Sequence, residues 1–155
     1  MDLYRVIGNP VSHSQSPWIH TRFAALTGQA LQYDKQLVPL DGFASAVQQF
    51  FAQGGRGCNV TVPFKFEAAA LATQVSDRAQ LAQAANTLTL RDDTVLADNT
   101  DGAGLVTKIY MSTGWAINMK SFLAVPSWCA RNLHLTHCTN QVRISQMAIV
   151  LSPFT

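Results

Sequence analysis

The chain has 155 residues, 48% hydrophobic and 13% charged, and a formal net charge of +2. This composition is typical of a globular domain and excludes a disordered chain or one embedded in a membrane. Residues 1–106 sum to −2 and residues 107–155 to +4. The four cations of the second part are scattered, which argues against a nucleic-acid-binding arm.

Alternating strands and helices are predicted from the start of the chain. Residues 3–7 form a short apolar strand, and a helix begins at Ser16 and Pro17, because proline suits the first helical position. Gly28 is placed to end this helix. Four large apolar residues fall on one face of the helix and are predicted to be buried: Trp18, Ile19, Phe23 and Leu26.

A second strand, helix and strand follow. Residues 31–38 form the second strand, and Asp41 is predicted to cap a helix that ends before Gly54. Its inward side chains are Phe43, Val47, Phe50 and Phe51. The third strand covers residues 58–62. This order predicts an α/β fold with a mostly parallel sheet flanked by helices.

Shorter elements complete the first part of the chain. Helices are predicted over residues 64–71 and from Ser76 to Gln83. Residues 87–90 and 95–97 form a hairpin around an acidic turn. Asp101 is a candidate cap for a further helix.

The stretch NVTVPFK, residues 59–65, carries the strongest functional signal. Asn59 and Thr61 are two residues apart, so they share one face of a strand. Pro63 ends the strand and leaves Lys65 at the entrance to the next helix. An amide, a hydroxyl and an ammonium thus meet at a strand's carboxyl end, where open α/β sheets bind ligands. The alternative is a buried strand with a solvated lysine.

Three further stretches belong to the same pattern: GNPVSHSQSP at residues 8–17, ANTL at 85–88 and DNTDGAG at 98–104. In this order and spacing, the four segments resemble the substrate-binding domain of shikimate dehydrogenases. The resemblance covers about residues 1–106. It implies NADP-dependent reduction of 3-dehydroshikimate to shikimate, in aromatic amino-acid biosynthesis. The preference for NADP over NAD rests on the family alone.

The resemblance also implies a catalytic pair, Lys65 and Asp101. A lysine ammonium can give a proton to the oxygen of a ketone as it is reduced, and can stabilise the developing charge. A nearby carboxylate would hold that ammonium and favour its charged form. The alternative is an ordinary surface ion pair.

Substrate-binding roles follow for five more residues. Ser14, Ser16 and Thr61 would bind the substrate carboxylate near a helix N-terminus, although Ser16 could instead simply cap that helix. Asn59 and Asn86 would bind ring hydroxyls, because an amide both donates and accepts. For these two the alternative is local hydrogen bonding to the backbone.

Two other polar residues carry weaker expectations. Asp77 falls where family members often have an acid on the cofactor side, but it could equally complement a helix dipole. His20 is expected to support packing.

Residues 107–155 do not resemble the family. They contain no acid and only one glycine, Gly114, so no Gly-x-Gly-x-x-Gly loop exists there. We predict that residues 1–106 form the shikimate-binding catalytic domain and that the Rossmann nucleotide domain is missing. The remainder is interpreted as an unrelated, frameshifted or truncated tail. Two cysteines and two histidines within it have poor spacing for zinc, and no metal site is expected: Cys129, His134, His137 and Cys138.

Three alternative functions stay open. The chain could bind shikimate without catalysing the redox step, because the nucleotide loop is missing. It could be a nonfunctional fragment with an exposed apolar face. It could also be a quinate/shikimate dehydrogenase, although the serine pair favours shikimate. Three further features argue for a cytoplasmic chain: it has no spanning apolar run, no secretory signal and no disulfide framework. The sequence does not indicate an oligomeric state.

Overall fold

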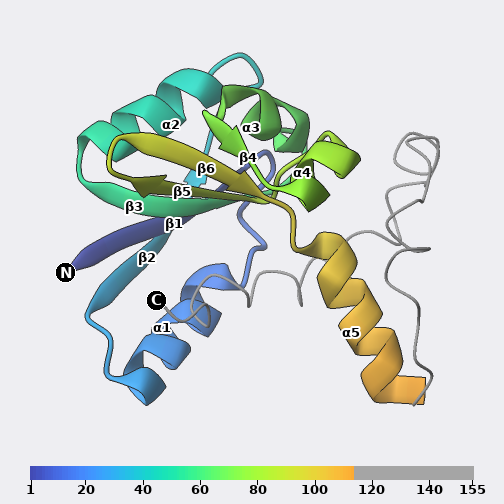
Figure 1. Ribbon diagram of the computed structural model, residues 1–155. Helices are drawn as coiled ribbons and strands as arrows, with labels where there is room; N and C mark the ends of the chain where they lie inside the picture. Colours follow the sequence, from blue (N-terminus) through green and yellow to red (C-terminus); the bar gives the residue numbers. More distant parts are fainter. Residues whose placement is uncertain (114–155) are drawn as a thin grey trace.

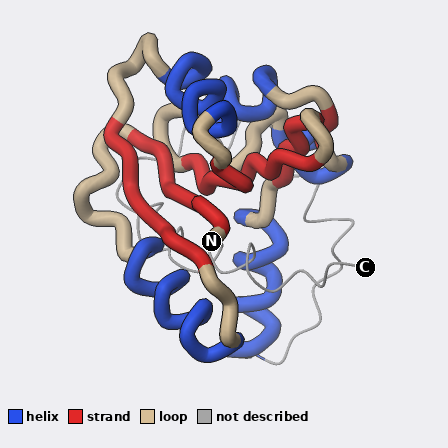
Figure 2. Tube along the Cα trace, turned by 90° about the vertical axis from the view of Figure 1, so that its left-hand side faces the viewer, coloured by secondary structure: helices blue, strands red, loops and turns tan. Residues whose placement is uncertain are grey.

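The computed structural model describes residues 1–113, which form one six-stranded sheet with helices on both faces (Figures 1 and 2). The strands are β1 (Asp2–Gly8), β2 (Leu31–Leu37), β3 (Gly55–Val60), β4 (Gln74–Val75), β5 (Thr87–Arg91) and β6 (Thr94–Asp98). The helices are α1 (Ser16–Thr27), α2 (Phe43–Ala52), α3 (Lys65–Leu71), α4 (Asp77–Ala82) and α5 (Asp101–Thr113).

The sheet is mixed, with the strand order β2-β1-β3-β5-β6-β4. The pairs β1–β2, β1–β3 and β4–β6 are parallel, whereas β5 runs antiparallel to both β3 and β6. The predicted hairpin accounts for β5 and β6, and its turn residues Asp92 and Asp93 have φ values of 45° and 62°. The α/β fold with flanking helices is confirmed, and β4 is a strand that the sequence did not indicate.

Side-chain alternation along β1 divides the interior into two clusters. Ile7 belongs to the larger cluster, together with residues of α2 and α3 such as Phe43, Phe50 and Phe64. Val6 points to the opposite face, where it packs with the half of the sheet that α1 covers. Figure 1 shows α2 and α3 above the sheet and α1 below it. The candidate site residues lie on the α1 side or at the strand ends.

The predicted buried face of α1 is wrong. Trp18 is 70% exposed and Leu26 68% exposed, whereas Ser16, His20 and Ala24 are buried. The physical reason is the aromatic surface beneath the helix: His20 packs edge-on against a strand tyrosine, and the small Ala24 lets the helix approach the sheet. An aromatic contact with a later strand therefore decides which face of α1 is buried.

The predicted cap of α2 is also wrong. The helix begins at Phe43 with Gly42 at the N-cap position, and no side chain caps it. The backbone already turns before the helix, because Gly42 N–H donates to the Pro39 carbonyl at 3.0 Å, and Asp41 stays exposed. In contrast, the Ser76 hydroxyl does cap α4 by accepting from the Ala79 N–H.

The end of the third strand differs from the prediction. The third strand ends at Val60 rather than at residue 62, because the Thr61 carbonyl accepts from the Phe64 N–H and starts a turn. The proposed end of the first domain, residue 106, lies inside α5, which continues to Thr113. The backbone therefore does not break where the sequence changes character.

Candidate functional site

Lys65 and Asp101 form an ion pair at the start of two helices. Lys65 is the first residue of α3, and Asp101 is the first residue of α5. The Lys65 Nζ lies 2.6 Å from the Asp101 Oδ2, and the two side chains are 20% and 32% exposed. A pair this accessible can meet a ligand, and it is more protected than an ordinary surface ion pair.

Asn86 holds the other oxygen of Asp101. Its Nδ2 donates to the Asp101 Oδ1 and to the Thr100 Oγ1, each at 2.9 Å. Its Oδ1 accepts from the Thr100 N–H at 3.1 Å. Both carboxylate oxygens of Asp101 are thereby fixed, one by an ammonium and one by a buried amide. A carboxylate held on both sides keeps its lysine partner in a defined position.

A pair of serines lies at the N-terminal end of α1. The Ser14 hydroxyl donates to the Ser16 Oγ at 3.1 Å and accepts from the Ser16 N–H at 3.3 Å. Ser16 is buried and Ser14 is half-buried. Gln15 occupies the N-cap position and its side chain makes no capping bond. The structure thus does not show the Ser16 side chain capping α1.

Asn59 connects these two regions through a tyrosine. The Tyr33 hydroxyl of β2 donates to the Asn59 Oδ1 at 2.5 Å, and the Asn59 Nδ2 donates to the Asn86 carbonyl at 3.4 Å. Ser16 lies close enough to the Tyr33 phenol to act on its pKa. Burial raises the pKa of Tyr33 well above its usual value, so the phenol keeps its proton and can donate.

Six of the predicted site residues therefore belong to one network that runs from Ser14 to Lys65. The network passes through Tyr33 and contains these predicted residues: Ser14, Ser16, Asn59, Asn86, Asp101 and Lys65. The strand pattern of residues 31–37 could have indicated Tyr33, which is buried in a strand whose other side chains are mostly exposed. Its bond to Asn59 could not be read from sequence.

Thr61 lies beside the network and supports the loop that carries the serines. A Cβ atom on Gly8 would lie 2.3 Å from the Thr61 Cγ2. The Asn9 N–H, one residue later, donates to the Val62 carbonyl at 3.0 Å. The end of β1 and the turn after β3 thus meet closely, which brings Thr61 to the loop of residues 9–15.

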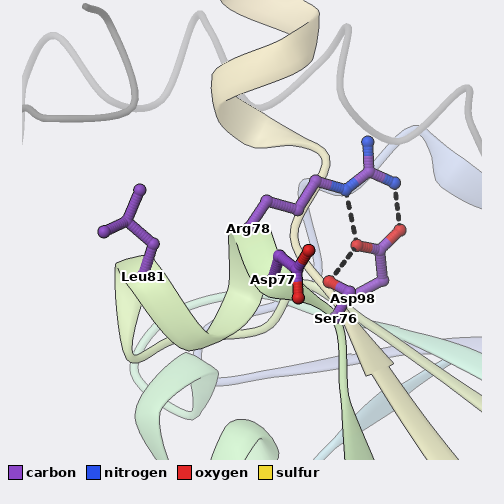
Figure 3. Close-up of a pocket in the computed structure, with 5 residues that line it drawn as sticks. All are labelled: Ser76, Asp77, Arg78, Leu81 and Asp98. Atoms are coloured by element: carbon purple, nitrogen blue, oxygen red, sulfur yellow. Dashed lines mark hydrogen bonds and ion pairs between the residues drawn. The ribbon is translucent and has the colours of Figure 1, made fainter. Parts of the chain in front are cut away.

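Asp77 lies in a different pocket. A surface cavity of about 440 Å³ is lined by Ser76, Asp77, Arg78, Leu81 and Asp98. Figure 3 shows these five side chains. The Arg78 guanidinium binds both oxygens of Asp98, and the Ser76 hydroxyl donates to the Asp98 Oδ1 at 2.6 Å. Burial acts to raise the pKa of Asp98, but the hydrogen bonds from Arg78 and Ser76 outweigh it and leave that pKa below its usual value.

The described residues do not fit the pyrophosphate of a dinucleotide. No Gly-x-Gly-x-x-Gly stretch occurs anywhere in the sequence. Within residues 1–113, the glycines with positive φ are Gly28 and Gly54, and each follows the end of a helix rather than opening one. Asp77 lines a pocket, but without a glycine turn the backbone offers no seat for the phosphates.

Neither a metal cluster nor a membrane-spanning helix occurs in the described part of the chain. Residues 1–113 contain no group of three histidine, cysteine or acidic side chains that could hold a metal ion. None of their helices is long and apolar enough to cross a bilayer. The cysteines and histidines after residue 128 lie outside the described residues.

The comparisons with known proteins identify the family. The family model for the shikimate dehydrogenase substrate binding domain matches residues 6–88, which is more than half of the chain. The chain belongs to the shikimate dehydrogenase family. The match contains the serine pair, Lys65 and Asn86, while Asp101 follows it.

Relatives named shikimate dehydrogenase (NADP(+)) extend this result. The chain is 60% identical over 124 residues to the one from Acidovorax sp. strain JS42, and covers 44% of its length. It is 59% identical over 125 residues to the one from Paracidovorax citrulli, again covering 44%. The chain thus spans less than half the length of these relatives. The similarity to the first, at 80% of the chain, also reaches past residue 106.

Solved shikimate dehydrogenases share the fold. The Thermus thermophilus enzyme, solved in complex with NADP(H) and shikimate, is 29% identical with a TM-score of 0.68, over 72% of this chain and 42% of that one. An Ael1 enzyme from Pseudomonas putida is 46% identical with a TM-score of 0.71, over 74% of this chain and 42% of that one. Both comparisons cover less than half of the solved chain.

Proposed function

We propose that this chain supplies the substrate-binding half of an NADP-dependent shikimate dehydrogenase, which interconverts 3-dehydroshikimate and shikimate. The observation that carries the proposal is the buried network that joins the serine pair to the Lys65–Asp101 ion pair. The names of the relatives, and a related structure that contains both NADP(H) and shikimate, support the same reaction.

The carboxylate of the substrate matches one end of the network, and its ring hydroxyls match the other end. Hydroxyls suit a carboxylate, and we assign that end to Ser14 and Ser16, with Thr61 beside them. Ring hydroxyls need groups that donate and accept, and we assign these to Asn59, Asn86 and the Lys65–Asp101 pair. Asn59 is 1% exposed and Asn86 3% exposed, so the more open Lys65 and Asp101 make the first contact.

Proton transfer is the chemistry that the described residues can perform. Reduction of a ketone leaves an oxygen that must gain a proton, and the Lys65 ammonium can supply it. Asp101 positions that ammonium, and Asn86 positions Asp101 through its Oδ1. In the reverse direction Lys65 must first lose its proton, which its carboxylate partner opposes. We therefore assign Lys65 the acid role during ketone reduction.

The cofactor half of the reaction is assigned to sequence that the described residues do not include. NADP is part of the proposal because the relatives are named for it. The chain covers 44% of such a relative, so a second candidate is a shikimate-binding module without redox activity. A reduced, cytoplasmic setting also remains part of the proposal, and the buried thiol Cys58 is free.

The division of the chain is likewise a proposal. We infer that residues 1–106 are the shikimate-binding catalytic unit and that residues 107–155 come from an altered reading of the coding sequence. The loss of all acidic residues after Asp101 supports this. The nucleotide sequence from codon 105 onward tests it, because a shifted frame within that stretch would restore a family-like continuation.

The function is tested by supplying the missing half. Residues 1–106 are joined to the nucleotide-binding half of the Acidovorax relative, and NADP-dependent oxidation of shikimate is measured. We expect turnover from this fusion and near-background turnover from the 155-residue chain. A folded fusion that binds NADP but does not oxidise shikimate would overturn the proposal. Shikimate binding by the 155-residue chain without turnover is the behaviour expected of its substrate half.

A further inference from the structure

The side chain of Tyr33 reaches across a strand of the sheet. Tyr33 lies on the edge strand β2, where it pairs with Tyr4 of β1. Asn59 lies on β3, beyond β1, where it pairs with Val6. The phenol packs against Val6 and its hydroxyl meets the Asn59 Oδ1 at 2.5 Å. Tyr33 is 5% exposed, so this is an interior contact between two strands that are not neighbours.

We propose that Tyr33 is a positioning residue of the shikimate site, which holds the Asn59 amide through its hydroxyl and lies beside the serine end. This inference rests on the proposed function. Tyr33 touches Ser16 on one side and Asn59 on the other, and neither neighbour is more than 1% exposed. The Tyr33 hydroxyl is not itself one of the proposed ligand groups, so its effect on the substrate must pass through Asn59.

The bond to Tyr33 fixes which way the Asn59 amide faces. Its Oδ1 accepts the phenol proton, so its Nδ2 must point the other way, toward the Asn86 carbonyl. Without the phenol, the buried Oδ1 would lack its donor, and the amide could turn to find another. A turned amide would place a carbonyl oxygen where the site now has a donor.

His20 holds the ring without competing for its hydroxyl. The two ring centroids are 4.2 Å apart with an interplanar angle of 63°, an edge-on contact. Both His20 nitrogens are buried and have no hydrogen-bond partner in the described part of the chain. Burial lowers the pKa of His20 to about 4, so the ring is neutral near pH 7. The Tyr33 hydroxyl is thereby left to Asn59.

The test removes only the hydroxyl, in the full 155-residue chain. Tyr33→Phe keeps the ring and its packing, and Tyr4→Phe on the neighbouring strand is the matched control, since Tyr4 packs against the same small cluster. The side-chain amide protons of Asn59 are followed by NMR in the absence of ligand. We expect Tyr33→Phe to shift them and speed their exchange with water, and Tyr4→Phe to leave them unchanged.

The second arm is a shikimate titration read by the same spectra. Tyr33→Phe should weaken shikimate binding about 2- to 10-fold, the range expected for one lost hydrogen bond. The effect should disappear in an Asn59→Ala background, because the two groups act through one contact. Tyr4→Phe should bind as the unaltered chain does.

The outcomes separate this inference from the function on which it rests. An Asn59 amide that Tyr33→Phe leaves unchanged overturns the positioning role, whether or not shikimate binds. Equal weakening by Tyr33→Phe with and without Asn59 also overturns it, since that is what a general loss of packing would give. If the unaltered chain does not bind shikimate at all, the proposed function fails, and the role of Tyr33 toward shikimate fails with it.

Discussion

Two ion pairs lie at the end of the β6 strand and differ in almost every respect. Asp98 ends β6 and binds Arg78 of α4, and Asp101 begins α5 and binds Lys65 of α3. The Arg78–Asp98 pair is bidentate and is completed by Ser76, within its own pocket (Figure 3). The Lys65–Asp101 pair has one short contact and continues through Asn86 into the buried network.

The two pairs differ in whether the cation can lose a proton. A guanidinium stays charged at any ordinary pH and uses its planar fork on the carboxylate, so the Arg78 pair suits a structural connection. An ammonium has three donors and can lose a proton, so Lys65 can hold Asp101 and still serve a ligand. We therefore propose that similar positions in the fold support structure in one case and chemistry in the other.

The largest expected effect tests the comparison of the two ion pairs directly. In the fusion that carries a complete nucleotide half, Lys65→Ala should lower kcat/KM for shikimate by at least about 100-fold, because general acid–base catalysis is lost. Arg78→Ala should change kcat/KM by less than about 3-fold, since Arg78 binds Asp98 in a pocket separate from the Lys65–Asp101 pair. Steady-state kinetics measure both. Similar losses from the two variants would mean that the pairs do not differ in function.

A glycine substitution tests the packing on the Lys65 side. Gly8→Ala places its Cβ 2.3 Å from the Thr61 Cγ2, and we expect it to lower the free energy of unfolding by about 1–3 kcal/mol. Gly102→Ala in the first turn of α5 meets nothing within 4 Å and should be neutral or slightly stabilising. Urea unfolding of the two variants measures this. Equal stability would show that the loop of residues 9–15 adapts easily.

The two regions should lose stability at different pH values, and the His20 region should respond first as the pH falls. The pKa of His20 is about 4 in the folded protein, below the usual 6.5, so the unfolded chain binds the proton more readily. Stability should therefore be fully present above pH 6.5 and fall by up to about 3 kcal/mol as the pH drops toward 4. Unfolding curves across this range measure the fall. His20→Asn should flatten it, and an unchanged slope in that variant would rule out His20 as its source.

The Arg78–Asp98 pair should respond only at lower pH. The pKa of Asp98 lies below its usual 3.8, so the stability from this carboxylate is present above that value and is lost as the pH falls through its folded pKa. Arg78→Ala should lower the free energy of unfolding near pH 7 by about 1 kcal/mol or less, because both groups are partly exposed. It should also reduce the loss seen below about pH 4. Thermal melts at several pH values check this.

Much of the fold followed from local patterns, and two helices are the exceptions. Strand periodicity, the acidic hairpin turn and the Ser76 cap act over a few residues, and each predicted its element. The buried face of α1 depends instead on Tyr33, which comes from a later strand. The cap of α2 depends on a turn at Pro39 that replaces Asp41. A contact with a distant strand decided the first, and a short turn that competes with the side-chain cap decided the second.

The candidate site shows the same division. The family resemblance pointed to Lys65, Asp101 and Asn86 because each lies in a short motif, and the structure brings the three side chains into contact. The sequence did not indicate the contact of Tyr33 with Asn59, because Tyr33 lies in no recognised motif and the two residues are on strands that are not adjacent. Asp77 could be placed on a helix start from the sequence, but not in a pocket with Arg78 and Asp98.

The most direct test of the central claim is a shikimate titration of the 155-residue chain by NMR, with and without NADP. We predict saturable shifts at Ser14, Ser16 and Asn86, unchanged by NADP, with Arg78 and Asp98 unaffected. Lys65→Ala should weaken these shifts, and Arg78→Ala should not. The absence of saturable shifts, or shifts confined to the Arg78 pocket, would contradict the claim that this chain holds the shikimate site.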